Sequence, residues 1–296
     1  MELDRKNGRK VAASGIAGII SQQMRPSVCL VLICVGVHAA CTRVEPPAAA
    51  AATRGPADSL IPAGAFGAAV RRGRAILTAT RDSLPDHVGN KLRCTSCHLD
   101  AGRRENGTWV GVFARYPQYR ARSGAVETIE YRVNDCFRRS MNGTAIDPAG
   151  PEMRDMVAYF AFLSQGTTIE GPAAGSSSRL QKWAAFTADT AAGARVFAAS
   201  CAKCHGVSGE GTAVAPPVWG PQSYNLGAGM TRVRTAAEFI SRNMPFDAPG
   251  TLADSQAFNV AAYVNGHPRP DFRGKENDWP NGDPPPDVAY PTRAHH

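Results

Sequence analysis

Apolar residues recur at helical spacing in several stretches of the chain. A period close to 3.6 predicts amphipathic helices over residues 63–81 and 151–164. Pro151 suits the first turn of the second helix, because its missing N–H has no partner there. The residues expected to point inward are Phe66, Val70, Ile76 and Leu77 in the first helix and Met153, Met156, Val157, Phe160 and Leu163 in the second.

The same plan repeats further along the chain. A helix over Ala192–Ala202 runs into a cysteine motif, and a helix over Ser255–Asn265 closes the unit with Phe258, Val260, Ala261 and Val264 inward. We find no convincing strand pattern in either unit. The pattern predicts a mainly α fold with two small domains in tandem, residues 60–165 and 181–266, each resembling a class I cytochrome c domain.

The remaining segments have the composition of connections. Residues 42–59 are rich in Ala and Pro and predict a flexible tether, and residues 166–180 predict a linker. The Pro-rich residues 267–296 have little periodicity, which favours an extended strap or a disordered tail.

Residues 1–41 resemble an export signal. The apolar run from Val28 to Ala40 is too short to span a membrane comfortably and follows Arg25. It ends at Cys41 in a sequence similar to a lipoprotein cleavage box, which would place a lipid anchor on that cysteine. Ordinary cleavage after a small residue is the alternative. We therefore expect a periplasmic protein, either free or attached to the membrane by a lipid on Cys41.

The charge adds little to this picture. The chain carries +8 at pH 7, and without residues 1–41 it has 28 basic and 23 acidic residues, or +5. No block of Lys and Arg is interleaved with aromatic residues, so we do not expect nucleic acid as a partner. A mild basic balance suits a small anionic substrate or an acidic partner.

Two Cys-x-x-Cys-His motifs carry the strongest chemical signal. They occupy Cys94–His98 and Cys201–His205, one in each unit. In such a motif Cys94 and Cys97, or Cys201 and Cys204, form thioethers to one porphyrin, while His98 or His205 faces its iron. A zinc site would need a second cysteine pair near each motif. The motifs predict two covalently bound haem c groups, whose attachment in bacteria requires export.

The second ligand of each iron is a separate question. In the second unit Met244, followed by Pro245, is favoured over Met230. In the first unit, residues 126–140 predict a helix with Cys136 on its apolar face, beside Ile129, Val133 and Phe137. The residues alone leave Cys136 and Met141 equally placed as ligands, and Cys136 could also be a small buried hydrophobic residue.

Longer stretches around these motifs resemble the dihaem thiosulfate dehydrogenases, which form tetrathionate. The similarity covers about residues 60–270, and the stretch around Cys136 is its most specific part. The segments that carry it are 92–102, 116–122, 132–143, 216–220, 227–230, 243–245 and 257–264. Sulfur-oxidising cytochromes with a haem-ligating cysteine are the nearest competing family.

The resemblance implies ligation of the first haem by His98 and Cys136 and of the second by His205 and Met244. It implies oxidative coupling of two thiosulfate ions to tetrathionate, with electrons passing through both haems to an external acceptor such as a small cytochrome c or another redox protein. A covalent Cys136–thiosulfonate and outer-sphere oxidation of bound thiosulfate are both compatible with these residues. A non-enzymatic electron carrier and a tetrathionate reductase are the alternative functions.

Arginine supplies the expected anion site. Between Cys94 and Met141 there are eight arginines and five acidic residues, and residues 92–181 contain no lysine. The guanidinium fork can hold two oxygens of a sulfonate at once. Arg122 and Arg132 match positions in the family motif and are expected to bind substrate, with Arg120 as the third candidate.

Overall fold

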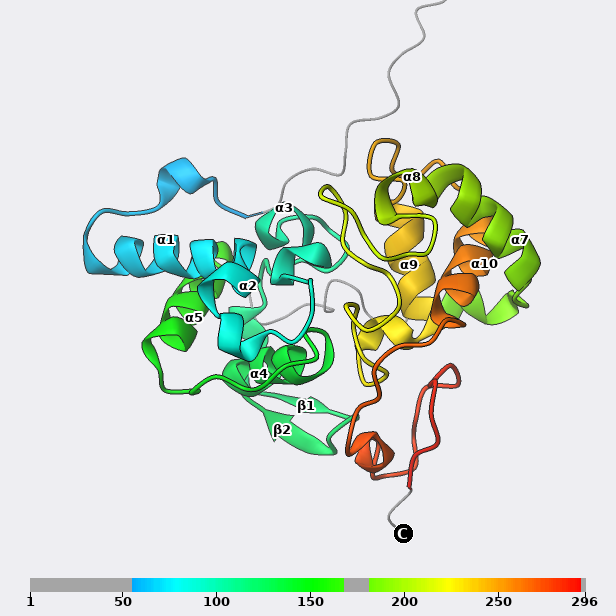
Figure 1. Ribbon diagram of the computed structural model, residues 1–296. Coiled ribbons are helices and arrows are strands. Elements are labelled where there is room, and N and C mark those ends of the chain that lie inside the picture. Colours follow the sequence, from blue (N-terminus) through cyan, green and yellow to red (C-terminus); the bar gives the residue numbers. More distant parts are fainter. Residues whose placement is uncertain (1–54, 168–180, 294–296) are drawn as a thin grey trace, which may run out of the picture. The chain divides into compact units, whose positions relative to one another are not determined.

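Helices dominate the part of the chain that the computed structural model describes, residues 55–167 and 181–293 (Figure 1). The α-helices are α1 (Gly64–Thr78), α2 (Thr80–Ser83), α3 (Leu99–Gly102), α4 (Ile129–Arg139), α5 (Pro151–Leu163), α7 (Thr190–Val196), α8 (Ala202–His205), α9 (Val233–Asn243) and α10 (Asp254–Asn265). Two short strands, β1 (Gln118–Arg120) and β2 (Ala125–Glu127), form an antiparallel hairpin. The predicted mainly α fold is confirmed. None of the helices in these ranges is both long enough and apolar enough to span a membrane.

Several predicted segments lie outside the described residues. They are the leader over residues 1–41 with Cys41, the tether up to residue 54 and the linker over residues 168–180. The described residues belong to one compact unit, which contains both cysteine motifs. The proposed domain boundaries at 60–165 and 181–266 stay a prediction.

Helices α1 and α5 pack against each other in the first half of the chain. At their closest approach a Cβ on Gly73 would lie 1.9 Å from the backbone oxygen of Asp155, so only glycine fits there. One residue earlier, Arg72 pairs with the Asp155 carboxylate through two bonds of 2.7 Å. The close crossing lets the inward faces of the two helices meet without a gap.

Helices α7 and α10 repeat this arrangement in the second half. A Cβ on Gly193 would lie 2.2 Å from the backbone oxygen of Asn259. The Asp189 side chain caps α7 by accepting from the Ala192 N–H at 2.8 Å. The Asn259 side chain in turn accepts from the Asp189 N–H at 3.0 Å. A glycine at each crossing thus sets the distance between the first and last helices of each half.

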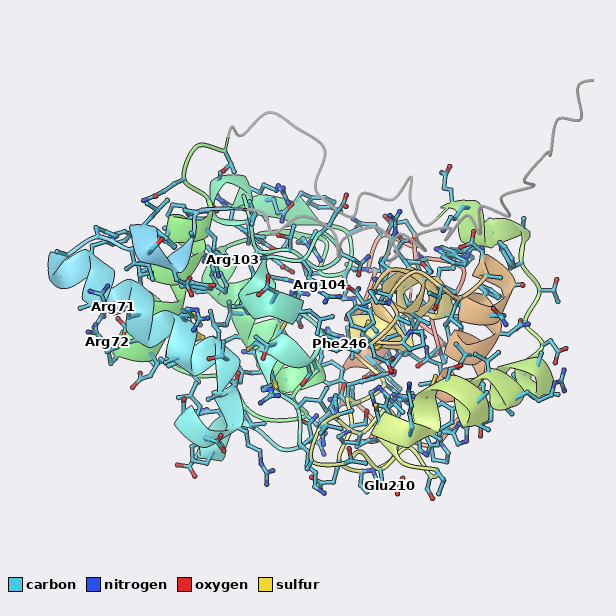
Figure 2. All side chains as sticks on the ribbon, turned by 90° about the horizontal axis from the view of Figure 1, so that it is seen from above. Arg71, Arg72, Arg103, Arg104, Glu210 and Phe246 are labelled. Atoms are coloured by element: carbon cyan, nitrogen blue, oxygen red, sulfur yellow. The ribbon has the colours of Figure 1, made fainter. Side chains whose placement is uncertain are left out.

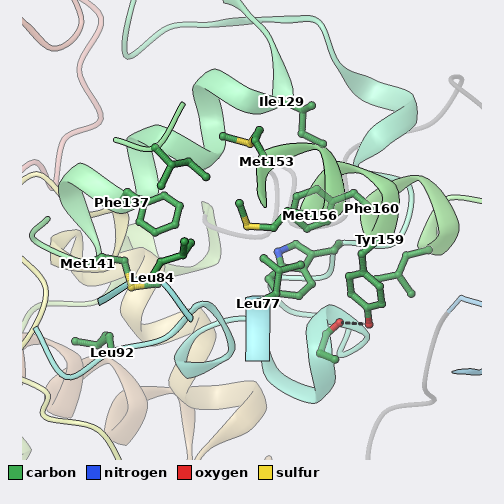
Figure 3. Packing of buried hydrophobic residues seen from close by; sticks show 14 of the residues in the cluster. Leu77, Leu84, Leu92, Ile129, Phe137, Met141, Met153, Met156, Tyr159 and Phe160 are labelled. Carbon is green, nitrogen blue, oxygen red and sulfur yellow. Dashed lines mark hydrogen bonds between the residues drawn. The ribbon is translucent and has the colours of Figure 1, made fainter. Parts of the chain in front are cut away.

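The core of the first half consists largely of the residues expected from the helical pattern (Figure 3). Val70, Leu77 and Leu163 are buried, as are Met153 and Met156. Figure 3 shows Met156 beside Phe160, and both methionines belong to the cluster that contains Leu77. The expectation that Phe66 points inward was wrong, because this side chain is 45% exposed. It lies roughly 10 Å along α1 from the crossing at Gly73, at 1.5 Å per residue.

The stretch over residues 126–140 differs from its prediction. The helix begins at Ile129 rather than Val126, and the Thr128 side chain caps it by accepting from the Tyr131 N–H at 3.3 Å. The residues before it form strand β2, which pairs with β1. Strands of three residues are too short to show an alternating pattern, which is why the hairpin was not predicted.

The C-terminal segment is an extended strap over the described residues 267–293. The Trp279 N–H donates to the Arg122 carbonyl at 2.7 Å, and the Asn281 side chain donates to the Tyr119 hydroxyl at 2.9 Å. Asp278 is buried and accepts from the Tyr290 hydroxyl at 2.6 Å. The strap therefore holds the loop between β1 and β2 in place.

Candidate functional site

The first cysteine motif forms one side of an apolar cavity. A 3₁₀ turn over Cys94–Ser96 leads into it, and the His98 N–H donates to the Cys94 carbonyl at 3.0 Å. Cys94, Cys97 and His98 all line this cavity. The cavity thus brings both cysteines and the histidine of the motif to one apolar space.

Hydrogen bonding and stacking fix the orientation of His98. Its Nδ1 donates to the Gly107 carbonyl at 2.6 Å, which leaves Nε2 as the nitrogen with a free lone pair. Its ring stacks on Trp109 at 4.9 Å between centroids. Burial lowers the pKa of His98 to about 4, so the imidazole is neutral at physiological pH.

Helix α4 places Cys136 at the same cavity. Cys136, Val133 and Phe137 are lining residues, as the helical pattern predicted. Met141 lines the cavity too and is buried. The structure therefore brings both candidate ligands to the first motif.

The donor set of this cavity fits a c-type haem. Burial raises the pKa of the Cys94 and Cys97 thiols to about 12, so both free thiols are protonated at physiological pH. Leu77, Leu92 and Phe160 provide apolar walls. Two cysteines and an oriented neutral histidine among apolar side chains are what a covalently attached macrocycle requires.

The second motif has the same local geometry. Helix α8 ends at His205, whose Nδ1 donates to the Pro216 carbonyl at 2.8 Å. Burial lowers the pKa of His205 as well. Cys201 packs against a cluster that contains Phe197 and Val260. The second histidine is therefore also neutral and oriented through its Nδ1.

Met244 follows the last residue of α9, in the loop that contacts the second motif. Lys203, inside the motif, pairs with Asp247 of this loop at 2.5 Å. Phe246 belongs to the same loop, and the Arg104 guanidinium lies 5.0 Å from the centroid of the Phe246 ring (Figure 2). The loop after α9 thus contacts both the second motif and the residues that follow the first.

Five arginines line a second, polar cleft. They are Arg120 and Arg122 from the hairpin, Arg132 and Arg139 from α4, and Arg232 from the residue before α9. Asp135 is the one acidic residue among the described residues that line it. The three arginines predicted to bind substrate therefore lie in one cleft, and such an excess of guanidinium groups favours small anions.

The cleft and the cavity meet at helix α4. Arg132 lines the cleft, and its Nη1 lies 3.1 Å from the Sγ of Cys136, which lines the cavity. Ser140 lines both spaces. The sulfur of Cys136 raises the pKa of Arg132, so this guanidinium is positively charged. An anion held in the cleft would thus lie next to the Cys136 sulfur.

Arg122 is held from several sides. Its Nη1 donates to the Gly227 carbonyl at 2.7 Å, and its guanidinium lies 4.8 Å from the Trp279 ring centroid. Burial and the neighbouring Arg139 lower the pKa of Arg122 to about 10. The Nε of Arg122 lies 3.9 Å from an Asp278 oxygen that Arg139 also binds, so this shared carboxylate balances the charge of Arg122 only in part, which favours an added anion.

Other arginines of this region are structural. Arg139 makes two bonds to Asp278, at 2.7 and 2.8 Å, and one to Asp135 at 2.5 Å. Arg103 is buried and donates to the Tyr159 hydroxyl and to Asp58. Their donors already have protein partners, so neither is available to a ligand in the way that Arg132 is.

Two residues of the cleft had no signal in the sequence. Arg232 and Trp279 come from the second half and the C-terminal strap, over 90 residues beyond the first-half arginines they join. Only long-range contacts place them there, such as the bond from Arg122 to Gly227 across 105 residues.

Comparison with known proteins agrees with the two-part architecture. The family described as SoxA/TsdA, cytochrome c domain, matches residues 87–169. The family described as cytochrome c oxidase, cbb3-type, subunit III, matches residues 188–264. These two stretches contain the first and the second cysteine motif, respectively.

Four relatives that match about three quarters of the chain are named thiosulfate dehydrogenase. Thiosulfate dehydrogenase of Psychrobacter arcticus is 43% identical over 244 residues, which cover 79% of this chain and 73% of the relative. Thiosulfate dehydrogenase of Allochromatium vinosum is 42% identical over 248 residues, covering 79% of this chain and 90% of the relative.

A solved structure has the same fold. Thiosulfate dehydrogenase TsdBA from Marichromatium purpuratum, in its as-isolated form, superimposes with a TM-score of 0.68 at 33% identity. The match covers 80% of this chain and 54% of that one, so this chain spans about half of that protein's length.

The fold and the two motifs define a c-type cytochrome with two cytochrome c domains, the class of protein that binds haem c covalently. The chain belongs to the thiosulfate dehydrogenase family.

Proposed function

We propose that this protein is an oxidoreductase that couples two thiosulfate ions into one tetrathionate ion and releases two electrons. The observation that carries the proposal is the contact between Arg132 and Cys136, because it joins an arginine-lined cleft to the haem cavity. A cytochrome that only carried electrons would have no need for such a cleft beside a cysteine sulfur.

The arginines bind and orient the substrates in this proposal. Thiosulfate is a dianion with a sulfonate end and a terminal sulfur. Arg120, Arg122 and Arg132 hold the sulfonate oxygens through charge-assisted hydrogen bonds, which are shorter and stronger than neutral ones. Arg132 then directs a terminal sulfur toward Cys136, 3.1 Å from its own Nη1. Two such ions, held side by side despite their mutual repulsion, can form the central sulfur–sulfur bond.

Two haem c groups fit the two motifs. Cys94 and Cys97 would hold one group, and His98 and Cys136 are the residues that would bind its iron. The other would be held by Cys201 and Cys204, with His205 and Met244 as ligands. When bound, haem c supplies one-electron acceptors, so two groups match the two electrons of the reaction. Methionine ligation raises the potential of a haem, so the group bound by Met244 would accept electrons more readily than the group bound by Cys136.

We also propose export to the periplasm, with an external redox protein such as a small cytochrome c as acceptor. Covalent haem attachment and the signal-like residues 1–41 support export. The lipoprotein-like sequence at Cys41 supports a lipid anchor, and mass spectrometry of the mature N-terminus would test it.

The activity is tested with purified holoprotein and an artificial electron acceptor. We expect one tetrathionate to form for every two thiosulfate ions consumed and two electrons accepted. The reverse reaction is assayed with a reduced donor and tetrathionate, and the proposal expects the oxidative rate to be the larger. Electron transfer without tetrathionate formation would instead support the electron-carrier alternative.

A further inference from the structure

Arg232 lies in the arginine cleft although it belongs to the second cytochrome c domain. It is the residue before α9, in the stretch matched by the second domain family, whereas the other four arginines of the cleft come from the hairpin and α4. The cleft of the first domain is therefore completed by a cation from the domain that was expected only to relay electrons.

One nitrogen of the Arg232 guanidinium has no hydrogen-bond partner among the described residues. This nitrogen is the Nε, which is buried. A buried donor without a partner costs free energy, so such groups commonly point to a missing ligand. Burial lowers the pKa of Arg232, and the positive charges of Arg120 and Arg132 lower it further, while Asp287 and Tyr290 oppose this. Arg232 thus faces the cations that are expected to bind substrate.

A charge balance supports a ligand at this position. Asp135 pairs with both Arg139 and Arg132, and Asp278 pairs with both Arg139 and Arg122, so five arginines face two carboxylates and five minus two leaves a net charge of +3. Two thiosulfate ions carry four negative charges, and tetrathionate carries two. The excess of positive charge therefore attracts the pair of substrates more strongly than the product, which carries half as many negative charges.

We infer that Arg232 is a further substrate-binding residue, which holds the sulfonate of the second thiosulfate ion so that both cytochrome c domains contribute to one anion site. The inference rests on the proposed function and names the part of the site that admits the second substrate. The chemical class it recognises is a small tetrahedral oxyanion with two negative charges.

Steady-state kinetics of holoprotein variants test this inference. In Arg232→Ala we expect the KM for thiosulfate to rise about tenfold or more, as for the loss of a hydrogen bond to a charged group. In Arg232→Lys we expect a smaller rise, because the charge remains but the fork is lost. The control is Arg195→Ala, which removes an exposed arginine of the same domain and should leave KM unchanged. An unchanged KM in both Arg232 variants would overturn the inference.

Calorimetric titration with sulfate separates this inference from the proposed function. Sulfate is a tetrahedral dianion that cannot be oxidised, so its binding does not depend on turnover. We expect wild-type protein and Arg195→Ala to bind sulfate alike and both Arg232 variants to bind it more weakly. Equal sulfate binding in all four proteins, or none in the wild type, would overturn the role of Arg232. Absence of thiosulfate oxidation in the wild type would instead refute the proposed function.

Discussion

The Nη1 of Arg132 lies 3.1 Å from the Sγ of Cys136, one turn further along α4. Residues four apart lie on the same face of a helix, so this contact follows from local structure once the helix forms. Its importance comes from its position, because Arg132 lines the polar cleft and Cys136 lines the apolar cavity. One face of α4 thus connects the arginine-lined cleft, where an anion can bind, to the apolar cavity of the first cysteine motif.

Replacing Arg132 by Ala should lower kcat/KM for thiosulfate about 10- to 100-fold, the effect of losing a hydrogen bond between charged groups. The substrate would lose both its sulfonate contact and the cation beside the Cys136 sulfur. Arg138→Ala is the matched control, since Arg138 is an exposed arginine on the same helix. Equal kcat/KM values for the two variants would show that Arg132 does not bind the substrate.

Replacing Gly102 by Ala should reduce the haem content of the purified protein. A Cβ at this position would lie 2.0 Å from the Trp109 ring, and the φ of Gly102 is +78°. Trp109 stacks on His98, so its displacement would disturb the histidine that faces the first haem. Haem per chain can be measured by absorbance after denaturation in alkaline pyridine.

The control for this change is Gly64→Ala. Gly64 has a φ of +82° but no neighbouring atom within 4 Å of the added Cβ. That variant should carry only backbone strain of about 1 kcal/mol and keep its haem content. If Gly102→Ala also kept full haem content, the packing of Trp109 against this turn would not be needed for haem attachment.

Replacing Asp278 by Ala should destabilise the protein by about 3 kcal/mol, because a buried ion pair loses one partner. Asp278 makes two bonds to Arg139 and accepts from Tyr290, so its loss frees the strap from α4. Urea unfolding of the holoprotein measures the change. Asp271→Ala, which removes an exposed carboxylate paired with Lys275, should leave the midpoint nearly unchanged. Equal midpoints for both variants would mean that the strap does not stabilise the cleft.

Local patterns predicted much of the fold. The spacing of apolar residues placed α5 and α10 within one residue of their ends, and it placed Cys136, Val133 and Phe137 at one surface. These features depend on neighbours along the chain. Phe66 shares the helical pattern but is 45% exposed, and a periodicity cannot show which turns of a helix have a packing partner.

The sequence predicted the arginines of the cleft that belong to the first domain, but not the residues that the second domain and the strap contribute. Arg122 and Arg132 stood out because they match positions of a family motif, and Arg120 was the third candidate, within the same thirteen residues. Arg232, Trp279 and Asp278 join them through contacts that span about a hundred residues or more. No pattern along the chain encodes such contacts, since they depend on how the second domain and the strap pack against α4.

The most direct test of the account compares Cys136→Gly with Met141→Leu in purified holoprotein. Both residues line the first haem cavity, but only Cys136 contacts the arginine cleft. Met141→Leu conserves volume and should keep tetrathionate formation and the electron paramagnetic resonance signal of a thiolate-ligated haem. Cys136→Gly should retain both haems and lose that signal together with thiosulfate oxidation. Thiosulfate oxidation at the wild-type rate in Cys136→Gly, or its loss in Met141→Leu, would contradict the account.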